Sequence, residues 1–243
     1  MKAIYTLLLA STLCGASFKA SANAAAGFQS YTNPTDERKV KDFHGIGSGG
    51  PIEVIVHMGS TESLKFEGDA EAIATLVAEV RNGILVIRPK NSWKSWAKTY
   101  ENKKITAHVN AKSLSSITIS GDGSIVVIGT VTAEALTTTL SGSGSIKANI
   151  DADKLTTVIS GSGQLNLQGK TSQISANLSG SCNFEGSALA TENLTARISG
   201  SGKITIKASN RIKATILGSG QIRYSGNPEI EKTVVGSGEV VEL

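Results

Sequence analysis

The stretch L-S-G-S-G-S-I at residues 140–146 decides the fold, because variants of it occur seven times in the chain. The first glycines of these stretches are spaced by 18 to 21 residues. They are Gly121, Gly142, Gly161, Gly180, Gly200, Gly218 and Gly236. A regular period of this length indicates a solenoid in which each repeat is one supersecondary unit.

Large apolar residues recur at fixed places around these glycines. Two residues before the first glycine stand Ile119, Leu140, Ile159, Leu178, Ile198, Ile216 and Val234. Four residues before it the residue is mostly small: Ile117, Thr138, Thr157, Ala176, Ala196, Ala214 and Lys232. Alternate residues of a strand face the same side, so each repeat is predicted to be a strand, a Gly-Ser-Gly corner and a second strand.

One such repeat buries too little apolar surface to fold alone, and stacking supplies the rest. We therefore predict an all-β protein with a right-handed parallel β-helix (β-solenoid) over residues 111–243, its strands starting near Leu114. In the last repeat Lys232 occupies the small inward slot. A charge there would discourage further strand pairing, so we interpret residues 230–243 as a terminal cap. The alternative is that this end of the chain is frayed.

The first 40 residues have a different composition. Residues 1–22 combine Lys2, an apolar run and a small-residue ending, as a secretory signal peptide does, with cleavage after Ala22 or Ala24. Residues 23–40 are predicted to be a flexible linker. Cys14 raises a lipoprotein alternative. We expect an exported protein located in the periplasm, on the outer membrane surface or outside the cell.

The charge and cysteine content exclude several classes of partner and bond. The formal net charge is +4, and it falls to +2 once Lys2 and Lys19 leave with residues 1–22. A nucleic-acid partner is therefore not expected. Only Cys182 would remain, which cannot form an internal disulfide. We expect no second transmembrane segment in the mature chain.

Residues 41–110 form a strand-rich part that precedes the repeats. The glycines of G-I-G-S-G-G at residues 45–50 match a dinucleotide-binding fingerprint, but they precede a strand instead of opening a helix, so a turn is predicted. Asp69 is predicted to cap a short helical turn. Asn82-Gly83 predicts a two-residue hairpin that pairs Arg81 with Ile84.

The order of these motifs resembles the auto-transporter adhesin family called the head GIN domain. The resemblance rests on Phe43-x-Gly45-Ile46, G-G-P-I-E-V-I-V at residues 49–56, N-G-I-L-V-I-R at residues 82–88 and the S-G-S-G-x-I repeats. It extends over about residues 41–243 and implies an exported bacterial β-helical domain of the adhesin type. The chain has no literal G-I-N tripeptide.

The segment at residues 90–104 is the main binding candidate, because it breaks the pattern with basic and aromatic residues. The candidate binding residues are Trp93, Lys94, Trp96, Lys98 and Tyr100. Exposed rings stack on sugars and lysines attract anions. The alternative is that the aromatics cover the apolar end of the solenoid. The outward Ser and Thr residues of the repeats form a second candidate surface.

Catalysis, cofactors and metals are not expected. The acids Asp122, Asp151, Asp153, Glu185 and Glu192 are scattered in sequence, and the three histidines have no zinc-ligand spacing. We therefore predict a non-enzymatic surface or periplasmic binding module, adhesin-like, with a glycan or another surface molecule as its partner. A carbohydrate-active enzyme is the first alternative, and two carboxylates within about 10 Å in a groove would favour it. A ligand-free structural envelope protein is the other alternative.

Overall fold

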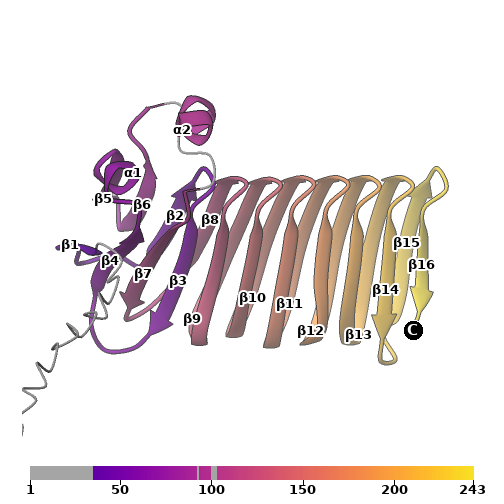
Figure 1. Ribbon diagram of the computed structural model, residues 1–243. Coiled ribbons are helices and arrows are strands. Elements are labelled where there is room, and N and C mark those ends of the chain that lie inside the picture. The colour runs from indigo at the N-terminus through magenta and orange to yellow at the C-terminus, as the bar shows by residue number, and fades with distance from the viewer. Residues whose placement is uncertain (1–34, 92, 100–102) are drawn as a thin grey trace, which may run out of the picture. The chain divides into compact units, whose positions relative to one another are not determined.

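The computed structural model describes residues 35–91, 93–99 and 103–243. The described residues fall into one compact unit. The predicted signal peptide and most of the predicted linker lie outside them. Figure 1 shows a β-solenoid of about seven turns with two short helices at its N-terminal end.

The elements before the repeats are β1 (Thr35–Arg38), β2 (Gly45–Gly49), β3 (Glu53–Met58), β4 (Ser63–Gly68), α1 (Ala70–Ala74), β5 (Leu76–Arg81), β6 (Ile84–Pro89), α2 (Trp93–Thr99) and β7 (Ile105–Ala111). The repeats contain β8 (Ser116–Gly121), β9 (Ser124–Gly142), β10 (Ser145–Gly161), β11 (Gln164–Gly180), β12 (Asn183–Gly200), β13 (Lys203–Gly218), β14 (Gln221–Ser225), β15 (Glu229–Val235) and β16 (Glu239–Glu242).

Each long strand contributes to two layers of the solenoid. In β9, the first residues pair with β3 and the last residues pair with β8, both in parallel. We call the layer before the corners the pre-corner sheet; its order is β5, β6, β2, β8, the C-terminal parts of β9 to β13, and β15. The post-corner sheet runs β1, β4, β7, β3, the N-terminal parts of β9 to β13, β14 and β16.

The stacked columns predicted from the repeats are present. Leu155 pairs with Ile174, and Ile159 pairs with Leu178, so like residues lie above one another in successive coils. Seven residues stand two positions before the first glycine of a repeat. Six of them are buried, and the seventh, Val234, is partly exposed. The core is therefore a continuous column between the two sheets, as the parallel stacking of repeats requires.

The corners need glycine for conformation and for space. Gly142 has φ +119°, and a Cβ there would lie 2.5 Å from the carbonyl oxygen of Gly121 in the preceding coil. Gly50, with φ +83°, lies beneath Gly121 in the same column and begins the first corner of the solenoid. The turn predicted for residues 45–50 is wrong for the residues before Gly50, because Gly45–Gly49 form β2, which pairs in parallel with β6 and β8. Cys182 replaces a glycine in the inward corner column, and burial raises the pKa of its thiol.

Two other local predictions before the repeats, the cap at Asp69 and the hairpin at Asn82-Gly83, are confirmed. The Asp69 carboxylate accepts a hydrogen bond from the backbone N–H of Ala72 and caps α1. β5 and β6 form the hairpin with Arg81 paired to Ile84. Asn82 (φ +51°) and Gly83 (φ +74°) both adopt the left-handed conformation that a type I′ turn requires.

The predicted linker is wrong at its C-terminal end. Residues 35–38 form β1, which pairs antiparallel with β4. Arg38 fixes this strand, because its guanidinium donates to the carbonyls of Ile73 and Leu76 and lies 4.7 Å from the ring centroid of Phe66. An edge strand held by backbone pairing and one partly buried arginine side chain has no apolar alternation from which to predict it.

Candidate functional site

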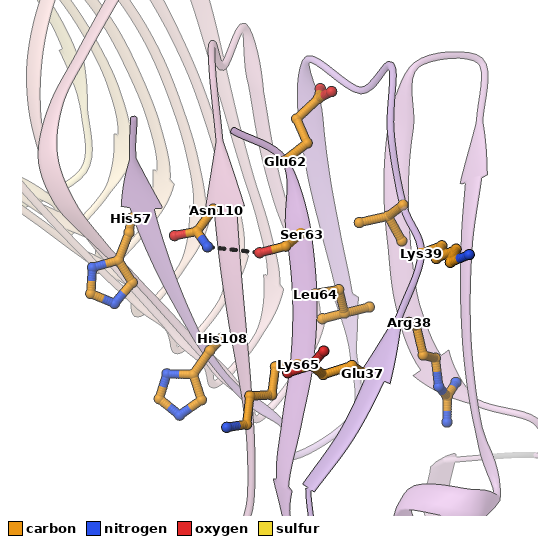
Figure 2. Close-up of a pocket in the computed structure, with 11 residues that line it drawn as sticks. Glu37, Arg38, Lys39, His57, Glu62, Ser63, Leu64, Lys65, His108 and Asn110 are labelled. Carbon is orange, nitrogen blue, oxygen red and sulfur yellow. Dashed lines mark hydrogen bonds between the residues drawn. The ribbon is translucent and has the colours of Figure 1, made fainter. Parts of the chain in front are cut away.

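A pocket of about 840 Å³ lies at the N-terminal end of the post-corner sheet. Its side chains come from β1, β3, β4, β7 and the adjoining loops (Figure 2). Its basic and hydrogen-bonding side chains include Lys39, His57, Ser63, Lys65, His108 and Asn110. We call this site the N-terminal pocket.

Strand alternation and register bring the two histidines of the pocket together. In β3 the buried Val54 and Val56 face the core, so His57 faces outward, and β7 places His108 outward in the same way. Lys65 is directly paired with His108, and Ile55 is paired with His108 on its other side. Figure 2 shows both imidazoles and Lys65 on the same side of the sheet.

Sequence reasoning missed this arrangement because β3 and β7 are about fifty residues apart. The alternation in E-V-I-V-H-M at residues 53–58 and I-T-A-H-V-N at residues 105–110 already predicts both histidines as outward-facing. The missing signal was the parallel pairing of the two strands across the inserted β4–β6 segment. His44 lies elsewhere, where its Nδ1 is 3.0 Å from the Ser115 Oγ.

The N-terminal pocket is lined by three cations (Arg38, Lys39 and Lys65), two carboxylates (Glu37 and Glu62) and several hydrogen-bonding groups, so the positive charge is in slight excess. Within the described part of the chain, neither Lys39 nor Lys65 has an ion-pair partner within 4.0 Å. The Asn110 side-chain amide donates to the Ser63 hydroxyl at 2.7 Å. The His108 Nε2 lies 3.5 Å from a Glu67 carboxylate oxygen, an ion pair only when the imidazole is protonated. Such a surface attracts anions.

One wall of the pocket is fixed by Glu62. Its carboxylate accepts hydrogen bonds from the backbone N–H groups of Asp42 and Phe43 and from the Lys112 ammonium at 3.3 Å. The Asp42 N–H, followed by Lys112, lowers the pKa of Glu62. Because its charge is satisfied by the protein, Glu62 ties together the loops before β2 and β4 and does not repel a bound anion as a free carboxylate would.

Aliphatic side chains continue the outer face from the pocket toward the repeats. Ile55 on β3 pairs with Val126 on β9, and His57 pairs with Ile128. Ile128 is 49% exposed, which is unusual among the large apolar residues of this solenoid. The outer face therefore changes from basic to aliphatic between β4 and β9.

A second cavity, of about 570 Å³, lies on the edge where the post-corner sheet passes into the pre-corner sheet. We call it the edge groove; it crosses β10 to β13 and the turn at Gly226 and Asn227. Asp151, Asp153 and Glu192 all line it. The sequence suggested that these acids were scattered, but the solenoid brings them to one groove.

The predicted aromatic site divides between described and undescribed residues. The Trp96 side chain is 5% exposed, and its indole N–H donates to the Thr75 hydroxyl at 2.7 Å. It packs at the N-terminal end of the core and presents no open ring face for a sugar. Lys98 is exposed. The side chains of Trp93 and Lys94, and Tyr100 as a whole, lie outside the described residues.

The hydroxyl-rich surface predicted for the repeats lies on the outer face of the pre-corner sheet. Thr156, Ser175 and Thr195 are paired in successive coils and line a cavity of about 290 Å³. Exposed Val158 and Leu217 interrupt the hydroxyl rows of this face. A binding role for it remains a prediction.

Neither a membrane helix nor a metal centre is found in what the structure describes. The two described helices are too short to cross a bilayer. Among the described side chains, no three His, Cys, Asp or Glu groups gather as a metal site would require.

Comparison with known proteins supports the same architecture. The profile of the family described as "Putative auto-transporter adhesin, head GIN domain" matches residues 42–228. A putative adhesin from Bacteroides fragilis has 24% identity and a TM-score of 0.79, over 88% of this chain and 98% of that one.

Two structures from Parabacteroides distasonis are also similar in fold. One, described as a putative lipid binding protein, has 24% identity and a TM-score of 0.66, over 88% of this chain and 98% of that one. The other, a putative adhesin, has 21% identity and a TM-score of 0.68, over 86% and 96%. No match was found among curated proteins.

Proposed function

Because the chain belongs to the auto-transporter adhesin, head GIN domain family, we propose that it is an exported, adhesin-like module that binds an anionic surface glycan in the N-terminal pocket. The observation that carries the proposal is the convergence of Lys39, Lys65, His57 and His108 in one cavity. The solenoid acts as the rigid scaffold of this surface.

The chemistry of the pocket suits a carboxylated or sulfated sugar. Lysine ammonium groups supply charge, while the Asn110 amide and the Ser63 hydroxyl can exchange their mutual hydrogen bond for bonds to sugar oxygens. A cavity of about 840 Å³ is large enough for a few sugar units. Binding is expected to weaken with salt.

A glycan array that includes acidic and neutral sugars tests this proposal, with Lys65→Gln as the variant. Lys147→Gln is a matched control, because Lys147 is an exposed lysine on the same face of the same sheet and outside the pocket. We expect Lys65→Gln to weaken acidic glycan binding about tenfold, since one hydrogen bond to a charged group is lost. Equal binding by the two variants would refute the assignment of the pocket.

A second candidate ligand is an anionic amphiphile such as a lipid. The aliphatic residues Ile55, Val126 and Ile128 beside the basic pocket favour it, and one structure of similar fold is described as a putative lipid binding protein. An anionic head would lie in the pocket, and an acyl chain would lie across β3 and β9.

The two candidates can be separated with alkyl phosphates. Under the lipid alternative, dodecyl phosphate should bind more tightly than butyl phosphate, and Ile128→Thr should remove the difference. Val158→Thr, which changes another exposed aliphatic side chain on the opposite sheet, is the control. Chain-length independence in the wild type would exclude the lipid alternative and leave the glycan proposal unaffected.

Export and the lack of enzymatic activity are further parts of the proposal. N-terminal sequencing of the protein from the cell envelope should begin at residue 23 or 25, and an uncleaved cytosolic protein would contradict export. Asp153 and Glu192 share one groove, as the carbohydrate-active alternative requires, but both are exposed, whereas a general acid that works near neutral pH needs a desolvated carboxyl group. We therefore expect no new reducing ends when polysaccharides are incubated with the protein.

A further inference from the structure

The edge groove is separate from the N-terminal pocket and has a different chemistry. It is lined by four successive coils, and its lining includes the small side chains of Ser172, Ala190 and Ser209. The groove runs across the strands, along the direction in which the coils stack. Its length covers about three strand spacings, roughly 14 Å, which suits an extended chain better than a compact ligand.

Two parallel rows of side chains follow from the register of the coils. The first row is formed by the paired residues Asp151, Lys170, Ala190 and Lys207. The second row contains Asp153, Ser172 and Glu192, because the residues on both sides of each are paired with one another. Asp153 and Glu192 are thus two coils apart, at a backbone separation of roughly 9.5 Å.

Some charged side chains of the two rows have an ion-pair partner and others do not. Lys170 forms an ion pair with Asp151 at 3.3 Å, so these two charges cancel. Asp153, Glu192 and Lys207 have no ion-pair partner within 4.0 Å among the described residues. The groove consequently presents two available carboxylates, one available ammonium group and the hydroxyl of Ser172, whereas the Ser209 hydroxyl donates to the Thr191 carbonyl at 3.4 Å.

We propose that the edge groove binds one extended polysaccharide chain that carries free amino groups, with its axis parallel to the stack of coils. Asp153 and Glu192 pair with amino groups two sugar units apart in an extended β1,4-linked chain. Ser172 between them bonds a sugar hydroxyl, and Ala190 leaves room for the sugar ring. The net negative charge of the groove disfavours a polyanion, opposite to the preference of the N-terminal pocket.

An extended peptide fits the groove less well. The backbone groups of the coil bends here already bond to neighbouring coils, and the hydroxyls of Thr171 and Thr191 donate to backbone carbonyls. A peptide would leave most of its own N–H and C=O groups without partners, which is costly. A polysaccharide presents hydroxyl and amino groups at the intervals at which the groove presents acceptors.

The experiment is calorimetric titration of the full chain with a β1,4-linked glucosamine hexamer and with its fully N-acetylated counterpart. We expect the wild type to prefer the free amine form by about tenfold or more, since charge-assisted hydrogen bonds are lost on acetylation. The double variant Asp153→Asn/Glu192→Gln should lose that preference. Glu242→Gln, which removes an exposed acid on the terminal strand, is the control and should bind as the wild type does.

A steric variant makes the test independent of charge. Ala190→Arg fills the floor of the groove and should abolish binding of the glucosamine hexamer, while acidic glycan binding in the N-terminal pocket is retained. Retained acidic glycan binding also shows that the variant is folded. Equal affinity of the wild type for both hexamers, or unchanged binding by the double variant, would overturn the proposal.

Discussion

The two ends of the solenoid differ in how they close its core. At the N-terminal end the β5–β6 hairpin, α1, α2 and the buried Trp96 adjoin the first coil (Figure 1). At the C-terminal end β15 and β16 are the last strands of the two sheets. Only the first end has elements that interrupt the repeat, and the N-terminal pocket lies among them.

The C-terminal core residues show the difference most directly. Ile212, Ile216 and Ile222 are fully buried. Their partners one coil later, Ile230, Val234 and Val240, are only partly buried. The same inward positions therefore contribute less burial of apolar surface, and so less stability, in the last coil, because no further coil packs against them. A capped end can hold a functional surface rigidly, whereas an open end tolerates change.

The largest expected effect comes from truncating a large core residue at each end. Phe66→Ala at the capped end should lower the free energy of unfolding by about 3–5 kcal/mol, because Phe66 is fully buried and a cavity remains. Val240→Ala at the open end should cost less than about 1.5 kcal/mol, since the side chain is partly exposed already. Urea denaturation measures both, and equal losses would remove the distinction between the ends.

Trp96→Phe sharpens the role of α2. It keeps an aromatic ring but removes the hydrogen bond to Thr75 and part of the buried surface, so we expect a loss of about 1–2 kcal/mol in stability. Acidic glycan binding at the N-terminal pocket should remain. If stability were unchanged while glycan binding fell, Trp96 would be a ligand-binding residue instead of a packing residue.

Lys232→Val tests whether the open end is protected against pairing. Lys232 pairs with Ala214 in the inward column, but its side chain is exposed. Replacing the charge by an apolar side chain should stabilise the last coil by about 0.5–1 kcal/mol and increase self-association, because an inward charge discourages pairing of an edge strand. Sedimentation velocity at several concentrations measures the association, with Lys154→Val, at an exposed lysine of an internal coil, as the control.

The smallest expected effect is the pH dependence of one carboxylate at each end. A hydrogen bond from Lys103 lowers the pKa of Asp69 at the capped end, and one from Lys213 lowers the pKa of Glu231 at the open end. A lowered folded-state pKa gives stability that is present above about pH 5 and lost as the pH falls through the folded-state value. Asp69→Asn and Glu231→Gln should therefore each differ from the wild type at pH 7 and converge with it near pH 2 in urea unfolding experiments.

The repeats could be predicted from the sequence more fully than the N-terminal end. In the repeats, the period and the apolar alternation assign each residue a place in the coil. The corner at Gly142 and the inward place of Ile159 were therefore predictable. The Asn82-Gly83 hairpin was predictable because its turn chemistry is local. The N-terminal pocket was not, since it depends on β4 and β7 meeting β3 across insertions of different length, and β1 is held by the single side chain of Arg38.

The edge groove was hidden for another reason. Asp153 and Glu192 belong to different coils, and coils differ in length by up to three residues between corners. The register shifts between β12 and β13 fall at this edge, where the sequence does not specify which residues are paired. A solenoid keeps its apolar columns aligned and places its irregularities in the bends, so the bends carry the least predictable chemistry.

One buried contact in the core bears on how such a chain can grow. Thr138 and Thr157 occupy the same small slot in adjacent coils, and their hydroxyls are 2.8 Å apart, whereas Ala176 and Ala196 fill that slot in the next coils. Deleting the coil that contains Thr157 would place Thr138 against alanine. The Thr138 hydroxyl would then be buried without its hydrogen-bond partner, which costs about 1–3 kcal/mol of stability. Deleting the Ala176 coil would leave the pair intact. Gene duplication and loss can therefore add or remove coils freely on one side of this pair, while the pair itself is inherited as a unit.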